Sequence, residues 1–413
     1  MSQDSLLGRI SGDVDRDRDT IVDFMVKMLK IKAINPRSGG PGESKRADLI
    51  ENYLKDEGFT VSRVDVPDAA SPTGSRPNLI VKLDGQDKSK TLWYAVHMDT
   101  VTEGSRDLWK TDPFDPVVKD GKIFARGSID DGQPLVAALF ALRELKKIGA
   151  KLPFNVGVAF VSDEETGSDY GAKYLLSHNY FGKKDLFIVP DDGSPDGVNV
   201  ELAEKSMLWV KVTVIGKQVH ASLPRKGLNA HRIGMKLALE LDEKLHEKYN
   251  ARNKLFQEET LSTFEPTKVK ANVDNVNTIP GVDLFYFDCR VLPEYSLEEV
   301  LTDFNVIAEK FKEEYGADTF VEPVSRDDAG PETLIESEVV KLAMRGIKFV
   351  TKKELRLVGI GGLTVANLFR KAGYPAVVWS TINDIAHEPN EYCVIDNLIN
   401  DTKVFATIPL MAD

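Results

Sequence analysis

Between residues 78 and 189, short apolar runs alternate with helix-forming segments, and this alternation restricts the fold more than any other feature of the chain. The run at 156–162 is apolar up to its final serine, which is typical of a strand buried on both faces. Such alternation predicts an α/β domain with a mostly parallel sheet covered by helices on both faces. The expected strands are 78–83, 91–96, 156–162 and 186–189, and the expected helices are 19–31, 45–57, 134–148 and 170–177.

After residue 204 the pattern changes to strands that alternate with two long helices. This pattern predicts a compact α+β unit inserted into the larger domain, which resumes near residue 325. The expected domains are therefore 1–205 and 325–413 for the larger one, and 206–324 for the insertion. Within the insertion we expect strands at 207–215, 268–276, 282–292 and 318–323 and helices at 230–249 and 297–315. Beyond it we expect a helix at 338–347, a glycine-rich turn at 359–362, a helix ending near residue 370 and a strand at 376–380.

The length of 413 residues also favours two domains, because a single hydrophobic core stops growing below that size. The formal net charge of −12 argues against a nucleic-acid partner, which would require clustered Lys and Arg. No apolar run approaches the ~18 residues of a membrane span, and residues 1–10 lack the pattern of a secretory signal. Cys289 and Cys393 are far apart and belong to no CxxC pair, which fits a reducing compartment. We therefore expect a cytoplasmic protein with no membrane contact.

Acidic residues and histidines follow the predicted strands at the points where they end. In open α/β sheets, ligands bind at these strand ends. So many carboxylates close together repel one another unless cations neutralise them, which favours a metal centre. A mixture of imidazole and carboxylate ligands suits zinc, cobalt or manganese. Two members have simpler expected roles: Asp131 is expected to cap the next helix, and Asp163 to be a turn or capping residue. The residues at strand ends are His97, Asp99, Asp130, Asp131, Asp163, Glu164, Glu165, Asp191, Asp192 and His387.

An ordered set of motifs resembles the M20 metallopeptidases, a family that also holds aminoacylases, succinyl-diaminopimelate desuccinylases and carboxypeptidase G-type enzymes. The resemblance covers nearly the whole chain, and the order of the motifs is more specific than any one of them. It implies a catalytic domain of the zinc-peptidase type with an inserted lid and dimerisation domain. The motifs are HMDTVTEGSRDLWKTDPFDPVVKDGKIFARGSIDDG, DEETGS, EKSMLWVKVTVIGKQVHASLPRKGLNA, NTIPG, DCRVLP, GIGG and HEPNEY.

Carried over by position, the resemblance implies a centre of two divalent metal ions, zinc above all, with cobalt or manganese as alternatives. His97 would bind one ion, His387 the other, and Asp130 would bridge them. Glu165 and Asp191 would each complete one ion. Asp99 would accept the second ring N–H of His97, and Glu164 would be the general base for a metal-bridging water.

The resemblance also implies residues that bind the substrate. His220 would reach the site of a neighbouring subunit and stabilise the oxyanion, and Arg290 would bind the substrate carboxylate. Asn277 would add a polar contact, and Gly361 and Gly362 would offer backbone N–H groups. The implied function is hydrolysis of a peptide or N-acyl amino acid amide bond beside a free carboxylate, by a homodimer formed through the lid domain.

Several alternatives stay open at this point. The chain has Gly132 where many relatives carry lysine, and VPDDGS where amidase-type members often have a glutamate; either Asp191 or Asp192 could be the ligand. Arg290 could instead be a strand residue paired with a nearby carboxylate. The substrate could be a di- or tripeptide, an N-acyl amino acid or succinyl-diaminopimelate. A two-metal phosphoesterase and a metal-binding protein without turnover are the competing functions.

Overall fold

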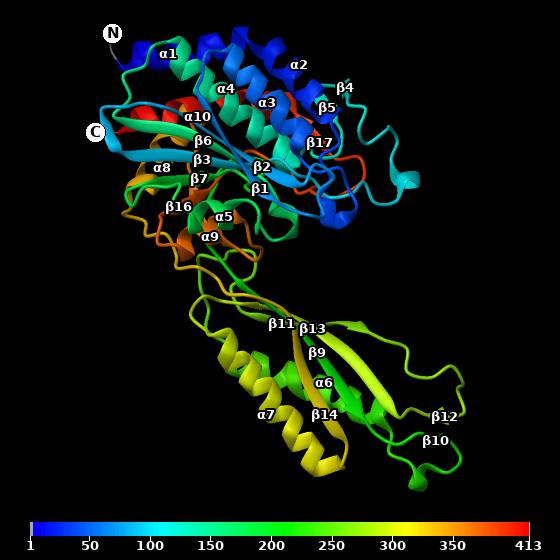
Figure 1. Ribbon diagram of the computed structural model, residues 1–413. Helices are drawn as coiled ribbons and strands as arrows, with labels where there is room; N and C mark the ends of the chain where they lie inside the picture. Colours follow the sequence, from blue (N-terminus) through cyan, green and yellow to red (C-terminus); the bar gives the residue numbers. More distant parts are fainter. Residues whose placement is uncertain (1–2, 413) are drawn as a thin grey trace. The chain divides into compact units, whose positions relative to one another are not determined.

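The computed structural model describes residues 3–412 and divides into two compact units (Figure 1). The first unit comprises the chain up to Leu202, Thr333–Leu357 and the chain from Thr364 onward. The second comprises Ala203–Glu332 and Val358–Leu363. The segment 358–363 was not expected in the second unit, and the roles of catalytic and lid domain stay predictions. Across residues 3–412, no helix is both long and apolar enough to span a bilayer.

An eight-stranded sheet in the order β1-β2-β6-β3-β7-β16-β8-β15 forms the centre of the first unit. Its four middle strands are parallel, and the predicted α/β class with a central parallel sheet is confirmed. The outer pairs β1–β2, β2–β6 and β16–β8 are antiparallel. The strands are β1 (Val61–Pro67), β2 (Ser75–Leu83), β3 (Asp87–His97), β6 (Phe154–Val161), β7 (Leu186–Val189), β8 (Asn199–Glu204), β15 (Arg356–Ile360) and β16 (Ala376–Val378).

Helices cover both faces of this sheet, as the apolar strands require. Successive strand residues face opposite sides: Trp93 packs in the core beneath the short helices, whereas Tyr94 meets Phe405 of α10 on the other side. The short helices on the first face are α5 (Ala172–Ser177) and α9 (Val365–Lys371). The other helices of the unit are α1 (Gln3–Arg16), α2 (Arg18–Leu29), α3 (Ser44–Asp56), α4 (Gln133–Lys147), α8 (Glu338–Thr351) and α10 (Ile395–Thr407). A small sheet joins β4 (Val117–Lys119), β5 (Lys122–Phe124) and β17 (Tyr392–Val394).

The second unit packs two helices on one face of a four-stranded antiparallel sheet in the order β11-β13-β9-β14. The helix α7 (Leu297–Tyr315) has the predicted bounds, because Ser296 caps its start and Gly316 ends it in a left-handed conformation. The other elements are α6 (Ala230–Lys248), β9 (Ser206–Ile215), β11 (Thr263–Val269), β13 (Val282–Val291), β14 (Asp318–Asp327) and the paired strands β10 (Val219–His220) and β12 (Thr278–Ile279).

Some predicted elements were wrong or missing. The strand expected at 268–276 lies earlier, at β11, whose Pro266 suits an edge strand with a bulge. Helix α10 was not predicted because its buried face includes polar residues such as Asp401 and Thr402, which weaken the apolar periodicity. Helix α1 and strands β1 and β8 were also not predicted, and β15 occupies part of the expected glycine turn.

Candidate metal centre

The candidate ligands of the first unit meet at one edge of its sheet. His97 is the last residue of β3, and Glu165 lies in the turn that follows β6. Asp191 comes two residues after β7, and His387 lies in the loop after β16. These strands are parallel neighbours, so their carboxyl ends coincide. Asp130 enters from the irregular turn Ser128–Gly132, just before α4.

The carboxylate of Asp130 joins two separate groups of ligand atoms. Its Oδ1 lies 2.9 Å from Nε2 of His97, which is also 3.3 Å from Oδ1 of Asp191. Its Oδ2 lies 2.9 Å from Nε2 of His387, which is also 3.1 Å from Oε2 of Glu165. Within each group the ligand atoms lie within 4.8 Å of one another. One carboxylate thus presents one oxygen to each of two histidine–acid pairs.

The two histidines are held among negative charges. Burial would lower the pKa of His97, but the charge of Asp191 and the hydrogen bond to Asp130 outweigh it and raise that pKa well above its usual value. Hydrogen bonds to Asp130 and Glu165 raise the pKa of His387 to about 10. Both ring Nε2 atoms therefore point into sites that favour positive charge.

The acids of the centre are crowded with like charge. Burial, and then the charge of Asp191, raise the pKa of Glu164 well above its usual value. Burial, and then the charge of Asp130, raise the pKa of Glu165 to about 7. Divalent cations would relieve this repulsion. The combination of imidazole and carboxylate oxygen, with no thiolate, fits zinc, cobalt or manganese, and both cysteines are buried elsewhere.

Of the two aspartates after β7, Asp191 is the one in a ligand group. The Asp192 carboxylate instead accepts the backbone N–H of the following Gly193 at 2.7 Å.

Two neighbouring aspartates, Asp99 and Asp131, contact His97. The Nδ1 atom of His97 lies 3.1 Å from the backbone carbonyl of Asp99 and 3.6 Å from its carboxylate, so the carbonyl is the nearer acceptor. The expectation that Asp131 caps helix α4 was wrong: no side chain caps this helix, and Asp131 accepts the backbone N–H of His97 at 2.8 Å. The ring and the backbone of His97 are thus both held.

Glu391 and Arg126 were missed as residues that shape the site. The buried Glu391 carboxylate accepts the backbone N–H groups of Ile129 and Asp130 at 2.8 and 3.3 Å. It also accepts Nη1 of Arg126 at 2.6 Å, and Nη2 of Arg126 donates to the carbonyl of His387 at 2.9 Å. The pair therefore connects the bridging residue to the second histidine. The available signal was the final glutamate of the HEPNEY motif, four residues after His387.

Gly132 has a steric explanation. A Cβ atom at this position would lie 2.2 Å from the carbonyl oxygen of Gly127. The tight turn that presents Asp130 therefore leaves no room for a side chain at this position.

The remaining predicted site residues belong to the second unit, where they lie in two separate groups. Arg290 lies on the helix-free face of the sheet and donates to Asp288 twice, at 2.7 and 3.1 Å. Its Nη1 also donates to the carbonyl of Gly361 at 3.3 Å, and Gly362 is exposed next to it in sequence. The pairing with a nearby carboxylate that was considered for Arg290 is thus present, and the partner belongs to the same strand.

His220 is the last residue of the short strand β10, and Asn277 directly precedes its partner strand β12. His220 is exposed and pairs with Thr278, and the carbonyl of Asn277 accepts the N–H of Ala221 at 2.8 Å. Strand β12 leads through Pro280 and Gly281 into the start of β13 at Val282, whereas Arg290 lies near the other end of β13. Eight strand residues at ~3.4 Å each place the two ends about 27 Å apart. The two groups therefore lie near opposite ends of β13.

Comparison of the sequence with known proteins gives a family match over most of the chain. Residues 93–410 match the family model described as Peptidase family M20/M25/M40. An uncharacterised metallohydrolase of Methanocaldococcus jannaschii is 39% identical over 400 residues, which is 92% of this chain and 96% of the relative. A succinyl-diaminopimelate desuccinylase of Nautilia profundicola is 28% identical over 391 residues, 90% of this chain and 93% of the relative.

Solved structures share the fold at lower identity. Human carnosine dipeptidase 1 matches with a TM-score of 0.73 and 19% identity, over 98% of both chains. The dipeptidase Dug1p of Saccharomyces cerevisiae matches with a TM-score of 0.72 and 18% identity, over 100% of this chain and 99% of the other. At these identities the likeness describes the arrangement of the chain alone.

Proposed function

The chain belongs to peptidase family M20/M25/M40, and from this premise we propose that it hydrolyses an amide bond beside a free carboxylate in a small peptide or N-acyl amino acid. The observation that carries the proposal is the Asp130 carboxylate, whose two oxygens each face a different histidine–acid pair. A carboxylate can bridge ions ~3.5–4 Å apart, the spacing of hydrolytic two-metal sites.

In this proposal His97, Asp191 and Asp130 hold one ion, and His387, Glu165 and Asp130 hold the other. Zinc is the proposed native metal. Ions bound there would supply Lewis-acid polarisation of the scissile carbonyl and a more acidic water. Glu164 would take the proton of the attacking water and deliver it to the leaving nitrogen. Its burial and raised pKa suit a group that must both accept and release a proton.

Arg290 is the proposed partner of the substrate carboxylate. Asp288 holds its guanidinium through two hydrogen bonds, and a guanidinium has five N–H donors, so donors remain for a second carboxylate. Relatives named for desuccinylation and neighbours named as dipeptidases both imply an amide with a nearby carboxylate. Dipeptides, N-acyl amino acids and succinyl-diaminopimelate are therefore the substrates to test.

Metal dependence tests the proposal directly. We expect the purified protein to hydrolyse at least one of these substrates, to lose that activity after chelation, and to regain it with zinc, cobalt or manganese. Hydrolysis would be followed by the release of free amine, with metal content measured on the same samples. Full activity in metal-free protein would contradict the proposal, and bound metal without turnover would favour a metal-binding protein.

Replacing Arg290 tests the carboxylate contact. Arg290→Ala is expected to lower kcat/KM by roughly 10–100-fold, since a hydrogen bond to a charged group contributes about 1.5–3 kcal/mol. The control is the same substrate with its carboxylate converted to an amide, for which parent and variant should differ little. An equal loss with both substrates would assign Arg290 to stability of the strand.

We also propose a homodimer formed through the second unit, in which His220 acts on the partner's substrate. His220 pairs with β12 next to the start of β13, whereas Arg290 lies near the other end of β13. This separation supports the role, because one small substrate cannot touch both residues of the same chain. A cytoplasmic location is a further proposal, supported by two buried, unpaired cysteines.

A further inference from the structure

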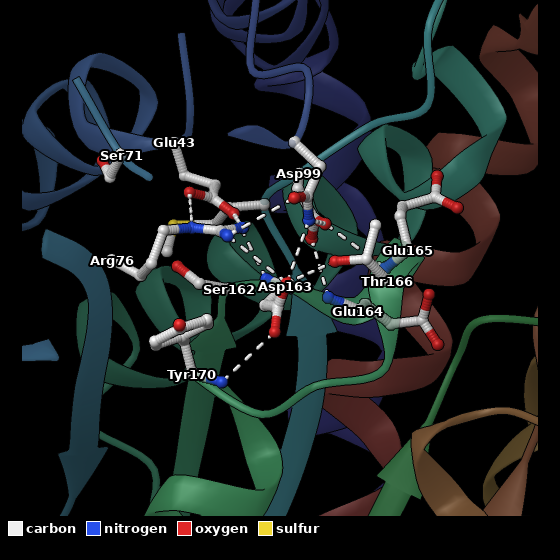
Figure 2. Close-up of polar contacts among 12 residues, drawn as sticks. Glu43, Ser71, Arg76, Asp99, Ser162, Asp163, Glu164, Glu165, Thr166 and Tyr170 are labelled. Carbon is white, nitrogen blue, oxygen red and sulfur yellow. Dashed lines mark hydrogen bonds and ion pairs between the residues drawn. The ribbon is translucent and has the colours of Figure 1, made fainter. Parts of the chain in front are cut away.

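Beneath the turn that carries Glu164 and Glu165 lies a group of polar side chains, of which Asn35, Glu43 and Arg76 belong to no motif. All five members are 0% exposed: Asn35, Glu43, Arg76, Asp99 and Asp163. Figure 2 shows Arg76 between Glu43 and Asp163, while the Glu164 and Glu165 carboxylates point away from these residues. We call these five residues the buried cluster.

Two carboxylates of the buried cluster hold the turn from opposite sides. Asp99 accepts the backbone N–H groups of Glu164 and Glu165 at 3.0 and 3.2 Å. Asp163, in a left-handed conformation with φ of 65°, accepts the hydroxyl of Thr166 at 2.5 Å and the backbone N–H of Tyr170 at 3.2 Å. The direction of the Glu164 and Glu165 side chains therefore depends on where these two carboxylates lie.

Asn35 is the residue that joins the two carboxylates. Its Nδ2 donates to Asp99 at 2.8 Å and to Asp163 at 3.1 Å. Its Oδ1 accepts the backbone N–H of Arg37 at 3.0 Å and Nη1 of Arg76 at 3.4 Å. Two buried carboxylates would otherwise repel each other, and a neutral amide with donors on one side and an acceptor on the other keeps them at a defined separation.

We propose that Asn35 is a positioning residue for the hydrolytic centre: through Asp99 and Asp163 it sets the placement of Glu164 and Glu165. The inference rests on the proposed function, in which Glu164 moves the proton and Glu165 holds metal. Groups that orient metal ligands through hydrogen bonds typically contribute ~10–100-fold to metal affinity or activity. A buried asparagine that only stabilises the fold would contribute to neither.

Asn155 offers a matched control for this role. It is also a buried asparagine of the first unit, accepting the N–H of Gly85 at 2.9 Å and donating to the carbonyl of Lys88 at 3.2 Å. It lies at the start of β6, whereas Asp163 follows the end of the same strand. Loss of its hydrogen bonds should destabilise the fold without changing the metal centre.

The test compares Asn35→Leu with Asn155→Leu in the full chain. Both are expected to lower Tm, since each leaves buried groups without partners. Only Asn35→Leu is expected to lower kcat ~10–100-fold with KM nearly unchanged, and to weaken Co²⁺ binding ~10-fold or more in a titration followed by visible absorption. Parent values of kcat and Co²⁺ affinity in Asn35→Leu would overturn the proposal, as would equal losses in both variants.

Two further measurements cover the cases in which a variant does not fold or the parent hydrolyses no substrate. Should Asn35→Leu not fold, Asn35→Ser removes the bidentate amide with a smaller change and is judged by the same criteria. Should the parent hydrolyse no substrate, the proposed function fails, and the Co²⁺ titration alone decides the role of Asn35. Weaker Co²⁺ binding confined to the Asn35 variants would still support it.

Discussion

Replacing Glu164 by glutamine is expected to lower kcat by about 10²–10⁴-fold, the range typical of a general acid–base residue, while bound metal is retained. Glutamine keeps the size of the side chain and its backbone N–H, which donates to Asp99 at 3.0 Å. It cannot take a proton from water. Turnover of the best substrate and metal content of the same sample provide the measurement.

Glu144→Gln is the matched control for this experiment. Glu144 is also a buried glutamate of the first unit whose pKa is raised mainly by burial, but it lies near the end of α4, and Asp130 precedes the start of that helix. Its replacement should leave kcat near the parent value. A kcat of Glu164→Gln within a few fold of the parent would remove Glu164 as the base.

Replacing Asp130 by asparagine is expected to have the second large effect. The amide can offer one oxygen but presents N–H donors where the second oxygen faces Nε2 of His387 at 2.9 Å. We expect the metal content to fall from two ions to one or fewer per chain. The loss of activity should exceed the ~10–100-fold that is typical when a residue hydrogen-bonded to a metal ligand is replaced. Metal analysis after dialysis, together with kcat/KM, tests this.

Asp185→Asn serves as the control for Asp130→Asn. Asp185 is a buried aspartate that accepts the backbone N–H of Thr91 and the indole N–H of Trp93 at 2.9 and 2.7 Å. It precedes β7, whereas Asp191 follows that strand. Its replacement should lower Tm but leave metal content intact. A full complement of metal in Asp130→Asn would contradict the bridging role.

The positions of several candidate ligands followed from local pattern. His97 is the last residue of an apolar strand, and Glu165 and Asp191 come just after two others; parallel strands end at a common edge. Their meeting could therefore be predicted once the α/β alternation was recognised. The bounds of α7 were equally local, because a serine cap and a glycine stop act within a turn of the helix.

Other features had no local signal. The selection of Asp191 over Asp192 for a ligand group, and the pairing of each Asp130 oxygen with a different histidine, depend on side-chain directions. The role of Asp131 was misjudged for the same reason. Its carboxylate accepts the backbone N–H of His97, which lies 34 residues away in the sequence. Adjacent aspartates look alike until the packing around them is known.

The buried supports of the centre were the least predictable part. Asn35 meets partners 64 and 128 residues away, and Glu391 holds a backbone N–H 262 residues away. Apolar periodicity and capping act over a few neighbouring residues, so the amino-acid order could indicate the α/β class, the inserted unit and the residues at the strand ends. A buried polar atom takes whichever partner the packed chain brings to it, so the bridging geometry and the cluster around Asn35 emerge only in the folded protein.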